Sequence, residues 1–162
     1  MLPNNYCHNI VDKVNSFLWR QWSQLGIAGG GTWNPNWIID PENLILFTLD
    51  AGRLDARLFD EVVDWLLTNE RWISLQRING LVKHCNEQTA LTLCALALFM
   101  DRHTTHSRWK KLAQCHSGKL SDPIPFFQRT DFQAMPVIGD PDPSFLDVGL
   151  VRSLISVRGL SK

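Results

Sequence analysis

Apolar residues recur at steps of three and four positions along the first part of the chain, which is the spacing of one face of an α-helix. Between residues 7 and 25 this stripe comprises Ile10, Val11, Val14, Phe17, Leu18, Trp22 and Leu25. Gly26 follows directly, and glycine commonly ends a helix because it adopts the left-handed conformation without steric cost. The pattern therefore predicts a first amphipathic helix that ends near Gly26.

The next two predicted helices carry start and stop signals of their own. The first begins at Asp40, Pro41 and Glu42: the aspartate can accept bonds from exposed amides, the proline fits the first helical position, and the glutamate favours the positive helix end. Gly52 is predicted to end this helix and Asp55 to begin the next. Because so few residues separate them, we predict that the two helices pack as an antiparallel pair.

Three more helices are predicted to follow. Residues 73–83 keep helical spacing, whereas residues 87–100 are apolar on nearly every side. A helix of the second kind belongs at the centre of a bundle or against a partner. Residues 105–116 are short and basic, with Trp109 and Leu112 as apolar anchors, so we expect this helix at the surface.

The composition changes in the last quarter of the chain. Five prolines interrupt it, at Pro123, Pro125, Pro136, Pro141 and Pro143. Long helices are not expected there because proline lacks the amide donor, although residues 135–138 suit a short strand and residues 143–148 one helical turn. We therefore predict an all-α protein, with a compact bundle of about five or six helices over residues 1–120 and a Pro-rich extended C-terminal arm or linker over residues 121–162.

Charge is balanced overall but unevenly distributed. Sixteen basic and sixteen acidic side chains give no net charge, which removes the general argument for nucleic-acid binding. Residues 1–70 nevertheless hold 4 basic and 9 acidic groups, whereas residues 71–120 hold 8 and 2. Such polarity suits an anion or a basic partner, although helical proteins often segregate charge with no functional purpose.

One basic patch is a candidate for contact with nucleic acid. It consists of Arg102, Arg108, Trp109, Lys110 and Lys111. Cationic side chains neutralise phosphates, and an indole can stack on a base. The alternative is that a lysine-rich helix simply keeps the protein soluble.

Two weaker constellations would imply catalysis or metal binding. Arg102 and His106 are the residue types that a helical ribonuclease uses for phosphate stabilisation and proton transfer, but their spacing is shorter than in the helical HEPN nucleases. A basic cluster that complements the negative end of a helix explains them better. Potential zinc ligands are His84, Cys85, Cys94, Cys115 and His116. Adjacent helical residues point about 100° apart and chelate poorly, so we predict no catalytic residue, no cofactor and no metal site.

Seven tryptophans are many for 162 residues. Trp22 and Trp65 fall on predicted apolar faces and are expected in the core. Trp33 and Trp37 lie in a glycine-rich, polar segment. Because tryptophan is favoured in interface hot spots, these two are the better candidates for binding a partner.

Two segments resemble a known group of bacterial proteins. The first, residues 17–66, reads FLWRQWSQLGIAGGGTWNPNWIIDPENLILFTLDAGRLDARLFDEVVDWL. It is similar to the N-terminal region of winged-helix transcriptional regulators and antitoxin-like proteins. The second, residues 139–161, reads GDPDPSFLDVGLVRSLISVRGLS and resembles the linker that precedes their winged helix.

The resemblance implies a helical N-terminal part and a C-terminal winged helix that contacts DNA, often in a setting that resembles toxin–antitoxin or nucleotidyltransferase gene pairs. The sequence ends at Lys162, before any such winged helix. The sequence is then either a piece of a longer protein or a naturally short form, and we expect DNA contact mainly through a C-terminal part that is absent here.

We expect a non-catalytic helical interaction module of a bacterial regulator, which associates with itself or with a protein partner. The alternatives are nucleic-acid binding through residues 102–119 and, less favoured, a helical ribonuclease of HEPN type. The N-terminal residues lack the pattern of a signal peptide, and no apolar run is long enough to span a membrane. A cytoplasmic location, with no membrane and no small-molecule substrate, is the simplest expectation.

Overall fold

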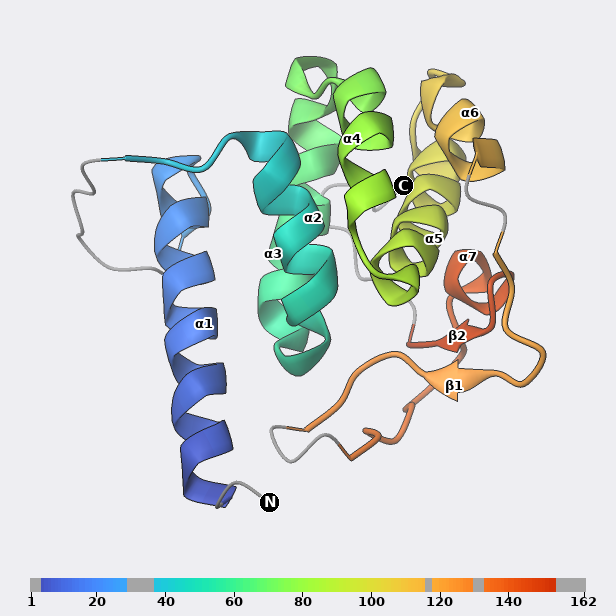
Figure 1. Cartoon of the computed structure of the whole chain (residues 1–162). Coiled ribbons are helices and arrows are strands. Elements are labelled where there is room, and N and C mark those ends of the chain that lie inside the picture. Colours follow the sequence, from blue (N-terminus) through green and yellow to red (C-terminus); the bar gives the residue numbers. More distant parts are fainter. Residues whose placement is uncertain (1–3, 29–36, 116–117, 130–132, 154–162) are drawn as a thin grey trace.

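The computed structural model describes residues 4–28, 37–115, 118–129 and 133–153, with side chains from residue 8 onward. These residues form a compact, all-α bundle with one very small sheet (Figure 1). The helices are α1 (Asn4–Gln24), α2 (Pro41–Ala51), α3 (Ala56–Asn69), α4 (Leu75–Leu81), α5 (Glu87–His103), α6 (Arg108–Cys115) and α7 (Pro143–Leu146). Short 3₁₀ turns extend three of them, at Gly52–Leu54, Glu70–Trp72 and Val82–His84. The strands are β1 (Ile124–Pro125) and β2 (Leu150–Val151).

The predicted helix boundaries are confirmed where side chains cap them. The Asp40 carboxylate accepts from the Asn43 amide at 3.2 Å, and the Asp55 carboxylate accepts from the Leu58 amide at 3.0 Å. After α1, Gly26 adopts a positive φ of 98°, as its position predicts. The close spacing of these signals explains why α2 and α3 pack together as neighbours.

α5 lies at the centre of the bundle, as its uniform apolarity predicts. Residues 91–97 are all buried, and the helix packs against α2, α6 and α7. α4 is shorter than the helix predicted for residues 73–83. Its start is set by Ser74, whose hydroxyl accepts from the Arg77 amide at 3.3 Å.

The proline-rich segment differs from the expected arm in where its side chains lie. Its backbone has little regular structure, as its prolines predict, but Phe126, Phe145, Val148 and Leu150 are buried in the same hydrophobic core as the helices. Up to residue 153 this segment therefore covers the bundle and does not lead away from it (Figure 1).

The predicted strand at residues 135–138 is wrong. The strands are instead β1 and β2, which pair in parallel with Ile124 opposite Leu150. The Met135 amide donates to the Phe127 carbonyl at 2.9 Å, but Pro136 cannot donate a ladder hydrogen bond, so the pairing stays an isolated bridge and does not extend into a strand. The predicted helical turn is confirmed as α7, which Asp142 caps by accepting from the Ser144 amide at 2.9 Å.

Two arginines fasten the proline-rich segment to the helices. Arg53, in the 3₁₀ turn that follows α2, donates from Nε to the Phe126 carbonyl at 2.8 Å. Arg152 donates from Nη2 to the Asp60 carboxylate of α3 at 2.6 Å. Each bond joins residues more than seventy positions apart, so the end of the described chain is held against its first half.

Replacing Asp40 with alanine is expected to lower the free energy of unfolding by about 1 kcal/mol near neutral pH, because α2 loses its cap. Burial alone would raise the pKa of Asp40, but hydrogen bonds from Asn43 and the charge of Arg77 hold this pKa below its usual value. The carboxylate therefore stabilises the fold fully above its unfolded-state pKa of about 4, and this stabilisation is lost as the pH falls through the folded-state pKa. Urea unfolding of the unaltered chain and of Asp40→Ala at several pH values measures this loss of stability. A loss that stayed the same in acid would contradict the role of the Asp40 carboxylate.

Candidate interaction surfaces

The indole N–H groups divide the tryptophans into two classes. Four donate to an acceptor within the fold: Trp19 to Asp55 Oδ2, Trp22 to Thr48 Oγ1, Trp65 to the Leu25 carbonyl and Trp109 to Glu70 Oε2. Trp22 is fully buried and Trp65 packs edge-on against it, as predicted for core residues. Trp37 and Trp72 are 57% and 71% exposed, so they are available to a partner, whereas Trp33 lies outside the described residues.

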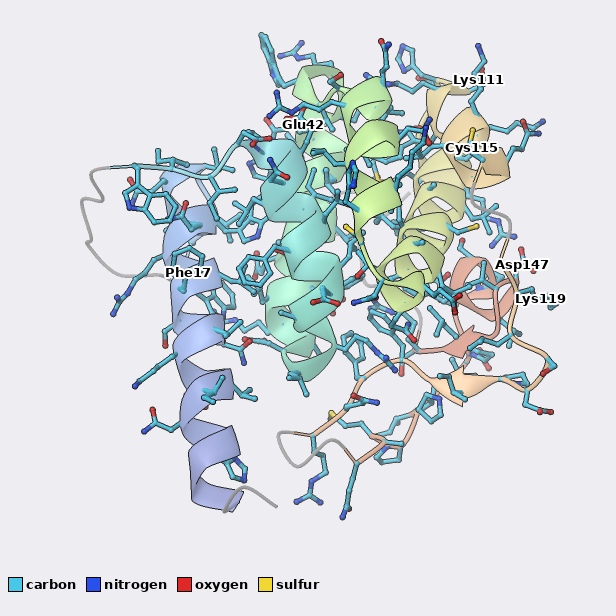
Figure 2. The ribbon with its side chains drawn as sticks, in the orientation of Figure 1. Phe17, Glu42, Lys111, Cys115, Lys119 and Asp147 are labelled. Atoms are coloured by element: carbon cyan, nitrogen blue, oxygen red, sulfur yellow. The ribbon has the colours of Figure 1, made fainter. Side chains whose placement is uncertain are left out.

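Three aromatic rings form a continuous patch at the junction of α1 and α2. Phe17 of α1, labelled in Figure 2, has its ring centroid 6.0 Å from that of Trp37 and 6.2 Å from that of Phe47 on α2. Both separations are in the range of favourable ring contacts. Trp37 and Phe47 are also solvent-exposed. We call Phe17, Trp37 and Phe47 the aromatic surface.

Further apolar and charged side chains surround the aromatic surface. Ile10, two turns before Phe17 on α1, is 47% exposed, and Ile38 beside Trp37 is 50% exposed. Lys13 is exposed on the α1 side, and Asp50 is exposed on the α2 side, where its Oδ1 accepts hydrogen bonds from Asn86 and Thr89. An apolar centre with a polar rim is the usual composition of a protein interface.

Arg102 and Arg108 of the predicted basic patch are bonded within the fold. Arg102 bridges α5 to α7, since it donates to Ser144 Oγ at 2.7 Å and to Asp147 Oδ2 at 2.6 Å (Figure 2 shows Asp147). The Arg108 guanidinium donates to the backbone carbonyls of Glu70 and Ile73. Both arginines therefore contribute to the structure of the bundle.

The expectation that Trp109 stacks on a base is wrong. Its side chain is fully buried, and its N–H donates to Glu70 Oε2 at 2.7 Å. The reason is the apolar face of α6, on which Trp109, Leu112 and Ala113 recur at helical spacing and turn inward. Lys110 and Lys111 remain exposed on the outer side of α6.

The geometry does not favour the ribonuclease pair. Arg102 is bonded to Ser144 and Asp147, whereas Nδ1 of His106 lies 3.4 Å from Glu70 Oε1. The two side chains thus engage different partners on different elements. Within the described ranges, no three His, Cys, Asp or Glu side chains are grouped so that they could hold a metal ion.

A groove of about 900 Å³ runs between α4 and α6. Its lining residues are Ser74, Leu75, Gln76, Asn79, Thr105, His106, Ser107, Arg108, Lys111, Leu112 and Cys115. Of the predicted basic patch, only Arg108 and Lys111 line it; Lys110 lines a separate hollow beside Lys119 and Asp147. We call the first of these the cationic groove.

Comparison of the chain with protein-family models, with curated proteins and with solved structures finds no match. Among the helices of the described part, none is long and apolar enough to cross a membrane. The functional assignment therefore depends on the two surfaces described above.

Proposed function

We propose that this chain is a non-catalytic helical interaction module that binds protein through the aromatic surface. The observation that supports this function is the contact of three rings at a solvent-exposed junction, where Trp37 and Phe47 have water on one side. Exposed aromatic clusters are rare on idle surfaces and frequent in the hot spots of interfaces. Trp37, which the sequence suggested as a partner-binding residue, contributes one of these three rings.

The partner that the charges favour is a second copy of the chain. Lys13 lies about one turn before Phe17 on α1, and Asp50 lies about one turn after Phe47 on α2. In a two-fold symmetric dimer whose axis runs along these two helices, the α1 side of one copy meets the α2 side of the other. Lys13 of each copy then faces Asp50 of its partner, so the rim is self-complementary.

The resemblance of residues 17–66 and 139–161 to bacterial regulators supports a place for this module in transcriptional regulation. In this proposal the module joins two regulator chains in the cytoplasm. DNA is then contacted by a winged helix that belongs to the regulator outside these residues.

Analytical ultracentrifugation tests this proposal. The unaltered chain is expected to sediment as a dimer that dissociates on dilution. Trp37→Ala and Phe47→Asp are each expected to weaken the dimer by about 30-fold or more, because a hot-spot side chain contributes about 2 kcal/mol or more to binding. Both residues are exposed, so the helical circular-dichroism spectrum should not change.

Ile138→Ala is the matched control. Ile138 is 80% exposed and apolar, but it lies on the proline-rich segment, away from the aromatic surface. Its replacement is expected to leave the dimer unchanged. A strictly monomeric protein at high concentration would exclude self-association through this surface.

A further inference from the structure

The cationic groove has a one-sided charge. Its basic lining residues are His106, Arg108 and Lys111, and none of its described lining residues is a carboxylate. Hydroxyl and amide groups make up most of the rest, with Leu75 and Leu112 as the apolar part. A groove with this lining attracts a flexible anionic chain.

The positive charges of the groove are only partly balanced within the fold. The guanidinium donors of Arg108 go to the carbonyls of Glu70 and Ile73, which are uncharged backbone groups. Lys111 is exposed on α6 (Figure 2). His106 faces Glu70, whose carboxylate also accepts the Trp109 N–H. Two carboxylates border the groove, since Glu70 faces His106 and Glu42 accepts from the Ser74 amide. An incoming anion would be held by Arg108 and Lys111 on the α6 side.

An exposed indole lies at the same end of the bundle. Trp72 is 71% exposed and precedes the groove residue Ser74 by two positions. Arg108 bonds to the carbonyls of Glu70 and Ile73, so it fixes the short turn that carries Trp72. The Arg71 guanidinium lies 5.1 Å from the centroid of the Trp72 ring, which adds a further cation beside it.

We propose that the cationic groove binds single-stranded nucleic acid, with phosphates at Arg108 and Lys111 and a base stacked on Trp72. Non-specific single-strand sites combine a cationic track for the backbone with aromatic side chains on which bases stack. An acidic peptide would use the same cations but would have little use for an exposed indole. This site is separate from the aromatic surface and does not depend on the proposed dimer.

Fluorescence anisotropy with short labelled strands of thymidine DNA and of uridine RNA tests the proposal. Trp72→Ala is expected to weaken binding by about ten-fold while the salt dependence stays the same, because stacking releases no counterions. Trp72→Phe keeps an aromatic face and should retain most of the affinity. Equal affinity for both strands indicates recognition of phosphate and base alone, and a preference for RNA indicates an added contact to the 2′-hydroxyl.

Lys111→Glu should weaken binding and also lower the slope of log affinity against log salt by about 0.7, which corresponds to one lost phosphate contact. Lys119→Glu is the charge-matched control, because Lys119 is exposed but lies outside the groove. It should leave both the affinity and the slope nearly unchanged.

Three results would overturn the proposal. One is no binding of either strand at low salt. The second is unchanged affinity in Trp72→Ala, with circular dichroism showing that the variant is folded. The third is displacement of the strand by polyglutamate at equal charge concentration, which would assign the groove to an acidic protein partner.

Discussion

Replacing Trp22 with alanine is expected to lower the free energy of unfolding by about 4 kcal/mol. The indole is fully buried, and its ring meets the Trp65 ring edge-on, with centroids 5.2 Å apart. Its N–H donates to Thr48 Oγ1 at 2.8 Å, which ties α1 to α2 inside the core. Truncation therefore leaves a cavity, removes an aromatic contact and deprives a buried hydroxyl of its donor.

Guanidinium unfolding followed by circular dichroism measures this loss. Trp72→Ala is the matched control, since it removes the same side chain from a site that is 71% exposed. It should change the unfolding free energy by no more than about 0.5 kcal/mol. Similar losses of unfolding free energy in the two variants would mean that burial does not determine how much each tryptophan stabilises the fold.

Replacing Asp60 with alanine is expected to lower the free energy of unfolding by about 3 kcal/mol, although the Asp60 side chain is 46% exposed. The reason is its partner: the Arg152 side chain is only 2% exposed and would lose its ion-pair partner, with the charge of Asp142 remaining nearby. Its guanidinium lies about 5 Å from the ring centroids of Phe59, Phe127 and Phe145. Burial lowers the pKa of Arg152, and the charge of Asp60 opposes this shift.

Arg152→Met is expected to lower the free energy of unfolding far less than Asp60→Ala does. Methionine retains apolar contact with the phenylalanine rings, and its introduction removes a charge that is expensive to bury. It also removes Nη1, a buried donor that has no hydrogen-bond partner in the described part of the chain.

The double variant completes a thermodynamic cycle for this pair. Once Arg152 is methionine, the further change Asp60→Ala should lower the free energy of unfolding by less than about 1 kcal/mol, because Asp60 no longer has a buried cationic partner. Urea unfolding of the four proteins gives the coupling directly. Additive losses would show that the two side chains act independently.

The helices were predictable from the sequence because their signals are local. Asp40 and Asp55 cap amides three positions away, so both helix starts can be read from a few neighbouring residues. The central place of α5 follows from its composition alone, since a helix that is apolar on every side needs neighbours all round. Such signals require no knowledge of tertiary contacts.

The candidate surfaces were harder to predict because they depend on which face of a helix or turn points outward. Trp109 and Trp72 are the same residue type in the sequence. Trp109 turns from α6 into the core and bonds to Glu70, whereas Trp72 projects into solvent from a 3₁₀ turn. Likewise, nothing local shows that Arg102 bonds to Asp147, forty-five positions later. The amphipathic pattern of α6 was the available signal that Trp109 turns inward.

The buried phenylalanines of the proline-rich segment have a consequence for the order in which the molecule assembles. Phe59 of α3 packs against Phe126 and Phe145, which the ribosome adds more than sixty residues later. During synthesis this side of α3 therefore stays uncovered until residues 126–145 have emerged. The nascent chain exposes an apolar aromatic face over that interval, and the helical bundle closes only when the proline-rich segment packs onto it.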